Sequence, residues 1–128
     1  MKKCKLSKDK PRTLQIEIDQ APPSINGMYR FTNRGGYITK KGREFKNYFE
    51  WQLKSARVKS FGAARLRTDY EFHFKGKRLR DTSNYIKTVE DCLKGILFDD
   101  DEQIDYITAK RYYHCPETKI IITISEIV

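Results

Sequence analysis

Residues 70–97 read YEFHFKGKRLRDTSNYIKTVEDCLKGIL, and within this stretch the apolar residues change from a strand-like to a helix-like spacing. Tyr70, Phe72 and Phe74 alternate with polar residues, a period of two that predicts a half-buried strand. Thr82 or Ser83 can cap a helix that runs to about Leu97. One arc of this helix carries Tyr85, Ile86, Val89, Cys92, Leu93, Ile96 and Leu97, and the opposite arc carries Asn84, Lys87, Glu90, Asp91 and Lys94.

The rest of the chain supplies elements of both kinds around this strand and helix. Alternation and helical spacing predict a strand at Thr13–Ile18, a loop or open hairpin at 25–37, a helix at Lys40–Ala56, and two late strands at Ile104–Tyr113 and Thr118–Ile124. The order β-α-β-α-β-β favours the α+β class, with two helices packed against a small mixed sheet. The 128 residues suffice for a single domain, preceded by a flexible basic amino terminus over residues 1–11.

The composition indicates which kinds of partner and which compartment to expect. A formal net charge of +9 attracts polyanions, which makes nucleic acid the first expectation. No apolar run approaches the roughly 20 residues that cross a bilayer, so we expect no membrane partner. Three cysteines without a C-x-x-C spacing suit a reducing compartment, and we expect a cytoplasmic protein.

The two charge signs are unevenly distributed. Residues 1–80 hold 21 basic and 7 acidic side chains, whereas residues 81–128 hold 5 basic and 10 acidic ones. This pattern favours a cation site beside an anion-binding surface.

The candidate cation site begins at Asp81 and continues through Lys87 and Asp91 to Asp99-Asp100-Asp101. Mg²⁺ prefers oxygen ligands and keeps several waters, so Asp81 and one of the later aspartates would suffice to hold it. Lys87 could add a fixed positive charge beside a phosphodiester, and Asn84 could orient the carboxylates. The plain alternative is a solvated acidic turn with an ordinary ion pair on the helix surface.

Two basic segments are candidate nucleic-acid contacts. The turn 75–80 leads directly into Asp81 and would hold a phosphate backbone through Lys75, Lys77, Arg78 and Arg80. The loop 25–37 offers Arg30 and Arg34, with Lys40 close behind, to grip a backbone or a base. The familiar nucleotide-phosphate loops and the serine-hydrolase elbow are absent from the sequence.

Three blocks of the sequence resemble the RusA family of Holliday junction resolvases, crossover junction endodeoxyribonucleases common in prophages. The first is Ala21-Pro22-Pro23-Ser24-Ile25-Asn26 with Tyr29-Arg30, and the second is Tyr37 to Arg43. The third combines Asp81-x-x-Asn84-x-x-Lys87, Asp91-x-Leu93-x-Gly95 and Asp100-Asp101-x-Gln103-Ile104.

The resemblance implies an Mg²⁺-dependent endonuclease that acts in DNA recombination and repair. It implies that Asp81 and Asp101 are metal-binding catalytic acids, with Asp100 beside them and Lys87 as their basic partner. It also implies a homodimer that makes paired, symmetric cuts in a four-way DNA junction, since a two-fold protein presents two identical sites.

Ser83 departs from the pattern of the family. The central motif usually reads D-x-D-N, and Ser83 stands where the second aspartate is expected. A serine hydroxyl is a poorer metal ligand than a carboxylate, so the site either lacks one acid or recruits Glu90 or Asp91. The alternatives to a nuclease are a non-catalytic DNA-binding protein of the same fold and an RNA-binding protein.

Overall fold

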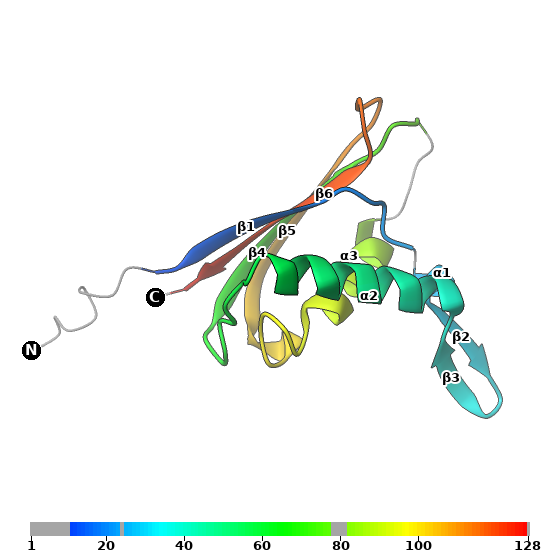
Figure 1. The fold of residues 1–128 in the computed structure, drawn as a ribbon, viewed down its shortest axis with the longest axis horizontal. Coiled ribbons are helices and arrows are strands. Elements are labelled where there is room, and N and C mark those ends of the chain that lie inside the picture. Colours follow the sequence, from blue (N-terminus) through cyan, green and yellow to red (C-terminus); the bar gives the residue numbers. More distant parts are fainter. Residues whose placement is uncertain (1–10, 24, 78–81, 128) are drawn as a thin grey trace, which may run out of the picture.

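The computed structural model describes residues 11–23, 25–77 and 82–127, and Figure 1 shows its fold. The elements follow in the order β1 (Thr13–Ile18), α1 (Ile25–Met28), β2 (Tyr29–Thr32), β3 (Gly35–Ile38), α2 (Lys40–Ser55), β4 (Leu66–His73), α3 (Thr82–Leu93), the 3₁₀ helix η2 (Asp101–Gln103), β5 (Ile104–Tyr112) and β6 (Lys119–Glu126). The predicted α+β class with two main helices is confirmed.

The main sheet is mixed, with the strand order β1-β6-β4-β5. β4 and β5 are parallel, whereas β6 is antiparallel to both β1 and β4. Two parallel neighbours cannot be joined by a tight turn, so the chain between them must cross over the sheet. α3 and the turn after it, which carries Asp99, Asp100 and Asp101 and is called the acidic turn below, form this crossover.

One face of the sheet holds the core. Tyr70 and Phe72 on β4 lie opposite Ile122 and Ile120 on β6, and all four side chains are buried. Phe45, Phe49 and Leu53 of α2 and Val89, Cys92 and Leu93 of α3 belong to the same hydrophobic cluster. The alternate residues of β4, such as Arg67 and Glu71, point to the other, more polar face. Within the described ranges, no helix is long and apolar enough to span a bilayer.

Two predicted boundaries differ from the observed ones by several residues. β4 begins at Leu66, earlier than the predicted Tyr70, because the buried face continues through the polar Thr68. The helix predicted to reach about Leu97 ends at Leu93, and Gly95 then adopts a left-handed φ of 85° that stops the helix. Leu97 and Phe98 are nevertheless fully buried, because the turn itself packs into the core. The segment 25–37 forms a short helix and a hairpin.

The amino-terminal end of α2 fixes the base of this hairpin. The Thr39 hydroxyl caps α2 by accepting from the Gly42 amide at 2.9 Å and donates to the Gly27 carbonyl at 2.6 Å. The Thr39 amide donates to the Met28 carbonyl at 2.8 Å. A Cβ atom on Gly42 would lie 2.5 Å from the Met28 oxygen, so only glycine allows this close approach of α2 to α1. Figure 1 shows β2 and β3 projecting from this junction, away from the sheet.

Candidate active site

Lys87 lies at the centre of the candidate site. Its Nζ is 3.5 Å from Oδ1 of Asp91, one turn later on α3, and 3.3 Å from Oδ2 of Asp101, the first residue of η2. The charge of Asp91 and the hydrogen bond to Asp101 raise the pKa of Lys87, so the amine stays protonated. The Lys87 side chain is half exposed and that of Asp101 is one-third exposed, so both can reach a substrate.

Glu90 lies on α3 beside this pair but is buried, with 7% of its surface exposed. The Tyr70 hydroxyl donates to Glu90 Oε2 at 3.4 Å from the neighbouring strand β4. Burial raises the pKa of Glu90, and the negative charge of Asp101 raises it further. Both effects favour the protonated form of the Glu90 carboxyl.

Tyr29 connects the base of the hairpin to the same site. Its hydroxyl donates to Asp91 Oδ2 at 2.8 Å, across 62 positions of sequence. Burial and this hydrogen bond raise the pKa of Tyr29, so the phenol remains a donor. A chain of contacts thus runs from Tyr29 through Asp91 and Lys87 to Asp101.

The acidic turn is held in place by the buried side chain of Gln103. Its Nε2 donates to the carbonyls of Gly62 and Ala64 at 2.8 and 2.7 Å, and its Oε1 accepts from the amides of Asp99 and Asp100 at 3.0 and 2.9 Å. This one amide group makes four hydrogen bonds and ties the turn to the segment before β4. The turn is ordered by Gln103 despite the mutual repulsion of its acids.

The structure brings some of the predicted site residues together and separates others. Lys87 contacts both Asp91 and Asp101, whereas Glu90 is buried against Tyr70 and the Asp100 carboxylate contacts Lys94 at 3.2 Å. Ser83 is exposed in the first turn of α3, and the Asn84 carbonyl accepts from the Thr88 hydroxyl. Three predicted residues, Arg78, Arg80 and Asp81, lie outside the described residues.

The predicted DNA-binding residues occupy separate parts of the surface. Arg30 and Arg34 are exposed on the hairpin, and Lys40 is exposed at the start of α2. Lys75 and Lys77 are exposed just beyond β4, in a segment that lies at the upper right of Figure 1, apart from the hairpin at the lower right. DNA bound to both groups would have to extend across the molecule.

The side chains of Tyr29, Tyr70 and Gln103 were not predicted to take part in the site. Tyr70 carried a usable signal, because a tyrosine on the buried side of a strand needs a partner for its hydroxyl. The contact of Tyr29 with Asp91 depends on how the hairpin folds back towards α3, which no local pattern in the sequence predicts.

The donor set of the site suits a hard divalent cation. Asp101, Glu90 and Asp91 offer carboxylate oxygens, the ligand type that Mg²⁺ prefers, and Mg²⁺ needs only one or two of them. Among the described residues, no group of three or more His, Cys, Asp or Glu side chains is arranged to hold a metal ion. The residues present fit a sparse, partly hydrated site better than a closed cage.

The Gln103 clamp can be tested by substitution. Gln103→Ala removes four hydrogen bonds made by a buried side chain, which should lower the free energy of unfolding by about 1–3 kcal/mol. Glu102→Ala, next to it and exposed, should change it by less than about 0.5 kcal/mol. Urea denaturation measures both, and equal effects would contradict the clamp.

The raised pKa of Glu90 predicts a pH dependence of stability. The folded protein holds this proton more tightly than the unfolded chain, so stability is complete below the ordinary glutamate pKa and falls as pH rises through the folded value. Glu90→Gln should therefore be more stable than the parent at neutral pH and lose this advantage in acid. Urea midpoints from pH 4 to pH 8 in EDTA measure the difference, and parallel curves for the two proteins would refute it.

Comparison with known proteins identifies the family of the chain. Residues 20–125 match the sequence profile described as Endodeoxyribonuclease RusA. No individual curated protein matches the chain. The matched range begins before the hairpin and ends within β6, so it contains the whole chain of contacts from Tyr29 to Asp101. The chain therefore belongs to the RusA endodeoxyribonuclease family.

Proposed function

We propose that the protein is an Mg²⁺-dependent endonuclease that resolves four-way DNA junctions by paired, symmetric nicks, in recombination and repair. Membership of the family supports endonuclease activity on branched DNA. The observation that carries the proposal is the position of Lys87 between Asp91 and Asp101. A cation and carboxylates from two separate segments meet where both can reach solvent.

Each residue has a distinct part in the proposed mechanism. Asp81 and Asp101 would hold Mg²⁺, supported by Asp100 and by Glu90 or Asp91. When bound, Mg²⁺ makes water a stronger nucleophile and offsets charge on the phosphodiester. Lys87, kept protonated by its neighbours, stabilises the additional negative charge on the phosphate oxygens as the phosphodiester is cleaved. Ser83 and Asn84, in the first turn of α3, support the carboxylates, and the exposed basic residues hold the DNA arms.

Ser83 stands where the family usually has an aspartate. Glu90 is a better candidate than Asp91 to replace that missing carboxylate. Ser83 and Glu90 are seven residues apart on α3 and lie on nearly the same side of the helix, since seven residues make about two turns. Asp91 is already engaged by both Lys87 and the Tyr29 hydroxyl. Glu90 has one long hydrogen bond, from Tyr70, and lies within the electrostatic reach of Asp101.

A homodimer is part of the proposal, because two nicks placed symmetrically require two sites related by a two-fold axis. Sedimentation of the free protein and of its junction complex tests this, and a monomer in both would contradict paired incision.

The reaction is tested on a synthetic four-way junction, a linear duplex and a structured RNA, each with Mg²⁺ or with EDTA. We expect symmetric nicks in the junction with Mg²⁺, none with EDTA, and no cutting of duplex or RNA. Tight junction binding without nicks under any divalent ion would instead identify a non-catalytic DNA-binding protein. Cleavage or binding confined to RNA would overturn the choice of substrate.

The catalytic acids are tested by isosteric substitution. Asp101→Asn and Asp81→Asn should each reduce the rate of nicking by a factor of at least about 100 while retaining junction affinity, since the loss affects charge stabilisation rather than the DNA-binding surface. Glu102→Gln is the matched control, because Glu102 follows Asp101 directly but is directed towards Arg65. Full activity of Asp101→Asn in single-turnover assays would overturn the assignment of this residue.

A further inference from the structure

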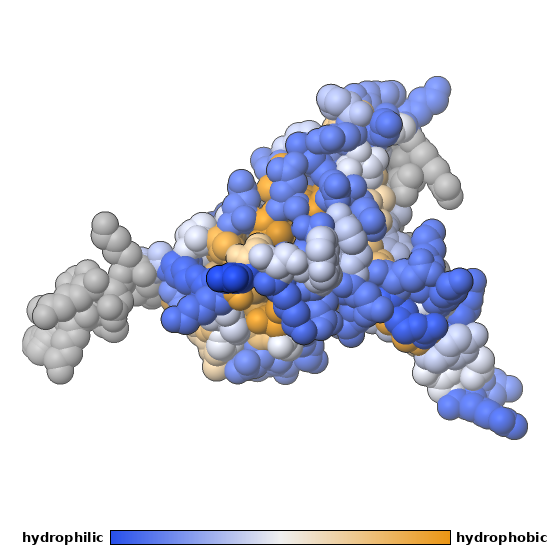
Figure 2. Space-filling view, in the orientation of Figure 1, coloured by the Kyte–Doolittle hydropathy of each residue, from blue (hydrophilic) through white to orange (hydrophobic). Residues whose placement is uncertain are grey.

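The hairpin formed by β2 and β3 is an ordered arm. Figures 1 and 2 show it standing clear of the body of the protein. Its turn is closed by the Thr32 hydroxyl, which donates to the Gly35 carbonyl at 3.0 Å and accepts from the Arg34 amide at 3.2 Å. Gly35 has a φ of 114°, a value that L residues rarely adopt. The arm therefore has a defined shape at its end as well as at its base.

Large aromatic side chains are exposed on both faces of this arm. Phe31 is 73% exposed and Tyr37 is 58% exposed. Phe31 lies across Gly36 on the opposite strand, where an added Cβ would be 2.9 Å from the ring. Tyr37 lies opposite the exposed Arg30. A two-stranded ribbon gains little stability from aromatic rings directed into water, so their exposure points to a contact outside the monomer.

The charge around these rings identifies the kind of partner. Residues 20–43 contain five Lys or Arg residues and no Asp or Glu. A second copy of the arm would meet the same positive charge, which disfavours its packing against itself. Single-stranded or splayed nucleic acid combines phosphates for the arginines with flat bases for the rings. The composition of the arm matches that combination.

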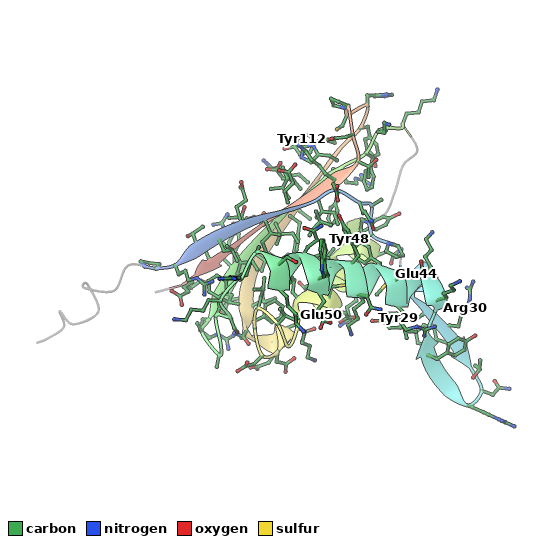
Figure 3. The ribbon with its side chains drawn as sticks, viewed as in Figure 1. Tyr29, Arg30, Glu44, Tyr48, Glu50 and Tyr112 are labelled. Atoms are coloured by element: carbon green, nitrogen blue, oxygen red, sulfur yellow. The ribbon has the colours of Figure 1, made fainter. Side chains whose placement is uncertain are left out.

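The base of the arm is linked to the candidate active site. Tyr29, the first residue of β2, donates to Asp91, and Asp91 contacts Lys87. Figure 3 shows Tyr29 and Arg30 together at this base, near the amino-terminal end of α2. Phe31 is two residues further along the strand, or about 7 Å, which equals roughly two base steps of DNA.

We propose that the hairpin recognises the branch point, with Phe31 and Tyr37 stacking on bases that are unstacked there while Arg30 and Arg34 hold the flanking phosphates. This inference rests on the proposed function and adds to it the element that distinguishes a branch from a continuous duplex. The link through Tyr29 sets the scissile phosphate within a few base steps of the stacked bases.

The test uses four-way junctions that carry the fluorescent base 2-aminopurine either at the branch point or in the middle of an arm. Binding is measured in Ca²⁺ for the parent, Phe31→Ala and Tyr37→Ala. We expect the parent to change the fluorescence of the branch-point probe only. Each variant should lose this change and bind the junction about tenfold more weakly, with duplex affinity within twofold of the parent.

Tyr106→Ala is the matched control, since Tyr106 is a half-exposed tyrosine on β5, outside the hairpin. It should retain both the fluorescence change and the affinity. Phe31→Trp should retain the stacking signal, which separates ring stacking from a structural effect.

Two results would overturn the inference. The first is a branch-point signal and junction affinity in Phe31→Ala and Tyr37→Ala equal to those of the parent. The second is a change of oligomeric state in the variants by sedimentation without a specific loss at the branch, which would make the hairpin a contact between copies. Failure of the proposed function is a separate result, because a parent that binds branch-point bases without nicking them supports the hairpin proposal and refutes catalysis.

Discussion

The parallel pairing of β4 with β5 is the constraint on which the site depends. Because these neighbours run in the same direction, the chain that joins them must travel back along the sheet before β5 begins. α3 makes the return and the acidic turn completes it. Lys87 and Asp91, from the middle of the crossover, therefore meet Asp101, from its end. The parallel pairing of β4 with β5 thus brings Lys87, Asp91 and Asp101 together.

The cluster combines groups that differ in their freedom to respond to a substrate. Glu90 is buried against Tyr70, and Asp91 is held by Tyr29, so the positions of these two acids are set by the fold. Lys87 and Asp101 are partly exposed and contact each other through a long hydrogen bond of 3.3 Å. Such a pair is weakly held and can exchange partners when a phosphate or a cation arrives. The site thus combines two acids held in place by the fold, Glu90 and Asp91, with an exposed pair, Lys87 and Asp101, that can change partners.

Much of the fold follows from local patterns in the sequence. The alternation of Tyr70, Phe72 and Phe74 predicted the buried face of the central strand, and the late strands were located to within a few residues. The end of α3 was missed because Ile96 and Leu97 continue the apolar pattern, although they belong to the turn after the helix, where Leu97 is buried. Periodicity reports which residues are buried and cannot distinguish a helix from a tight turn after a left-handed glycine.

The site was predictable only in part, for a related reason. Charge singled out Lys87 and the acidic residues 99–101, the resemblance to the RusA family selected Asp101 among them, and the structure pairs Lys87 with Asp101. The burial of Glu90 was not predictable from its place on the polar arc, because burial depends on how closely α3 packs against β4. The bond from Tyr29 to Asp91 joins segments 62 residues apart, and only the tertiary fold specifies it.

The position of β6 has a consequence for how the protein is made. β6 lies between β1 and β4, and among the described strands β1 pairs with β6 alone. During synthesis the ribosome therefore releases β1, α2, β4 and α3 before the strand that joins them exists. Closure of the sheet waits for residues 119–126, since such distant pairings form late. A chain cut short before residue 119 would leave the acidic turn without a completed sheet beneath it, so synthesis errors should yield inert fragments rather than partially active nucleases.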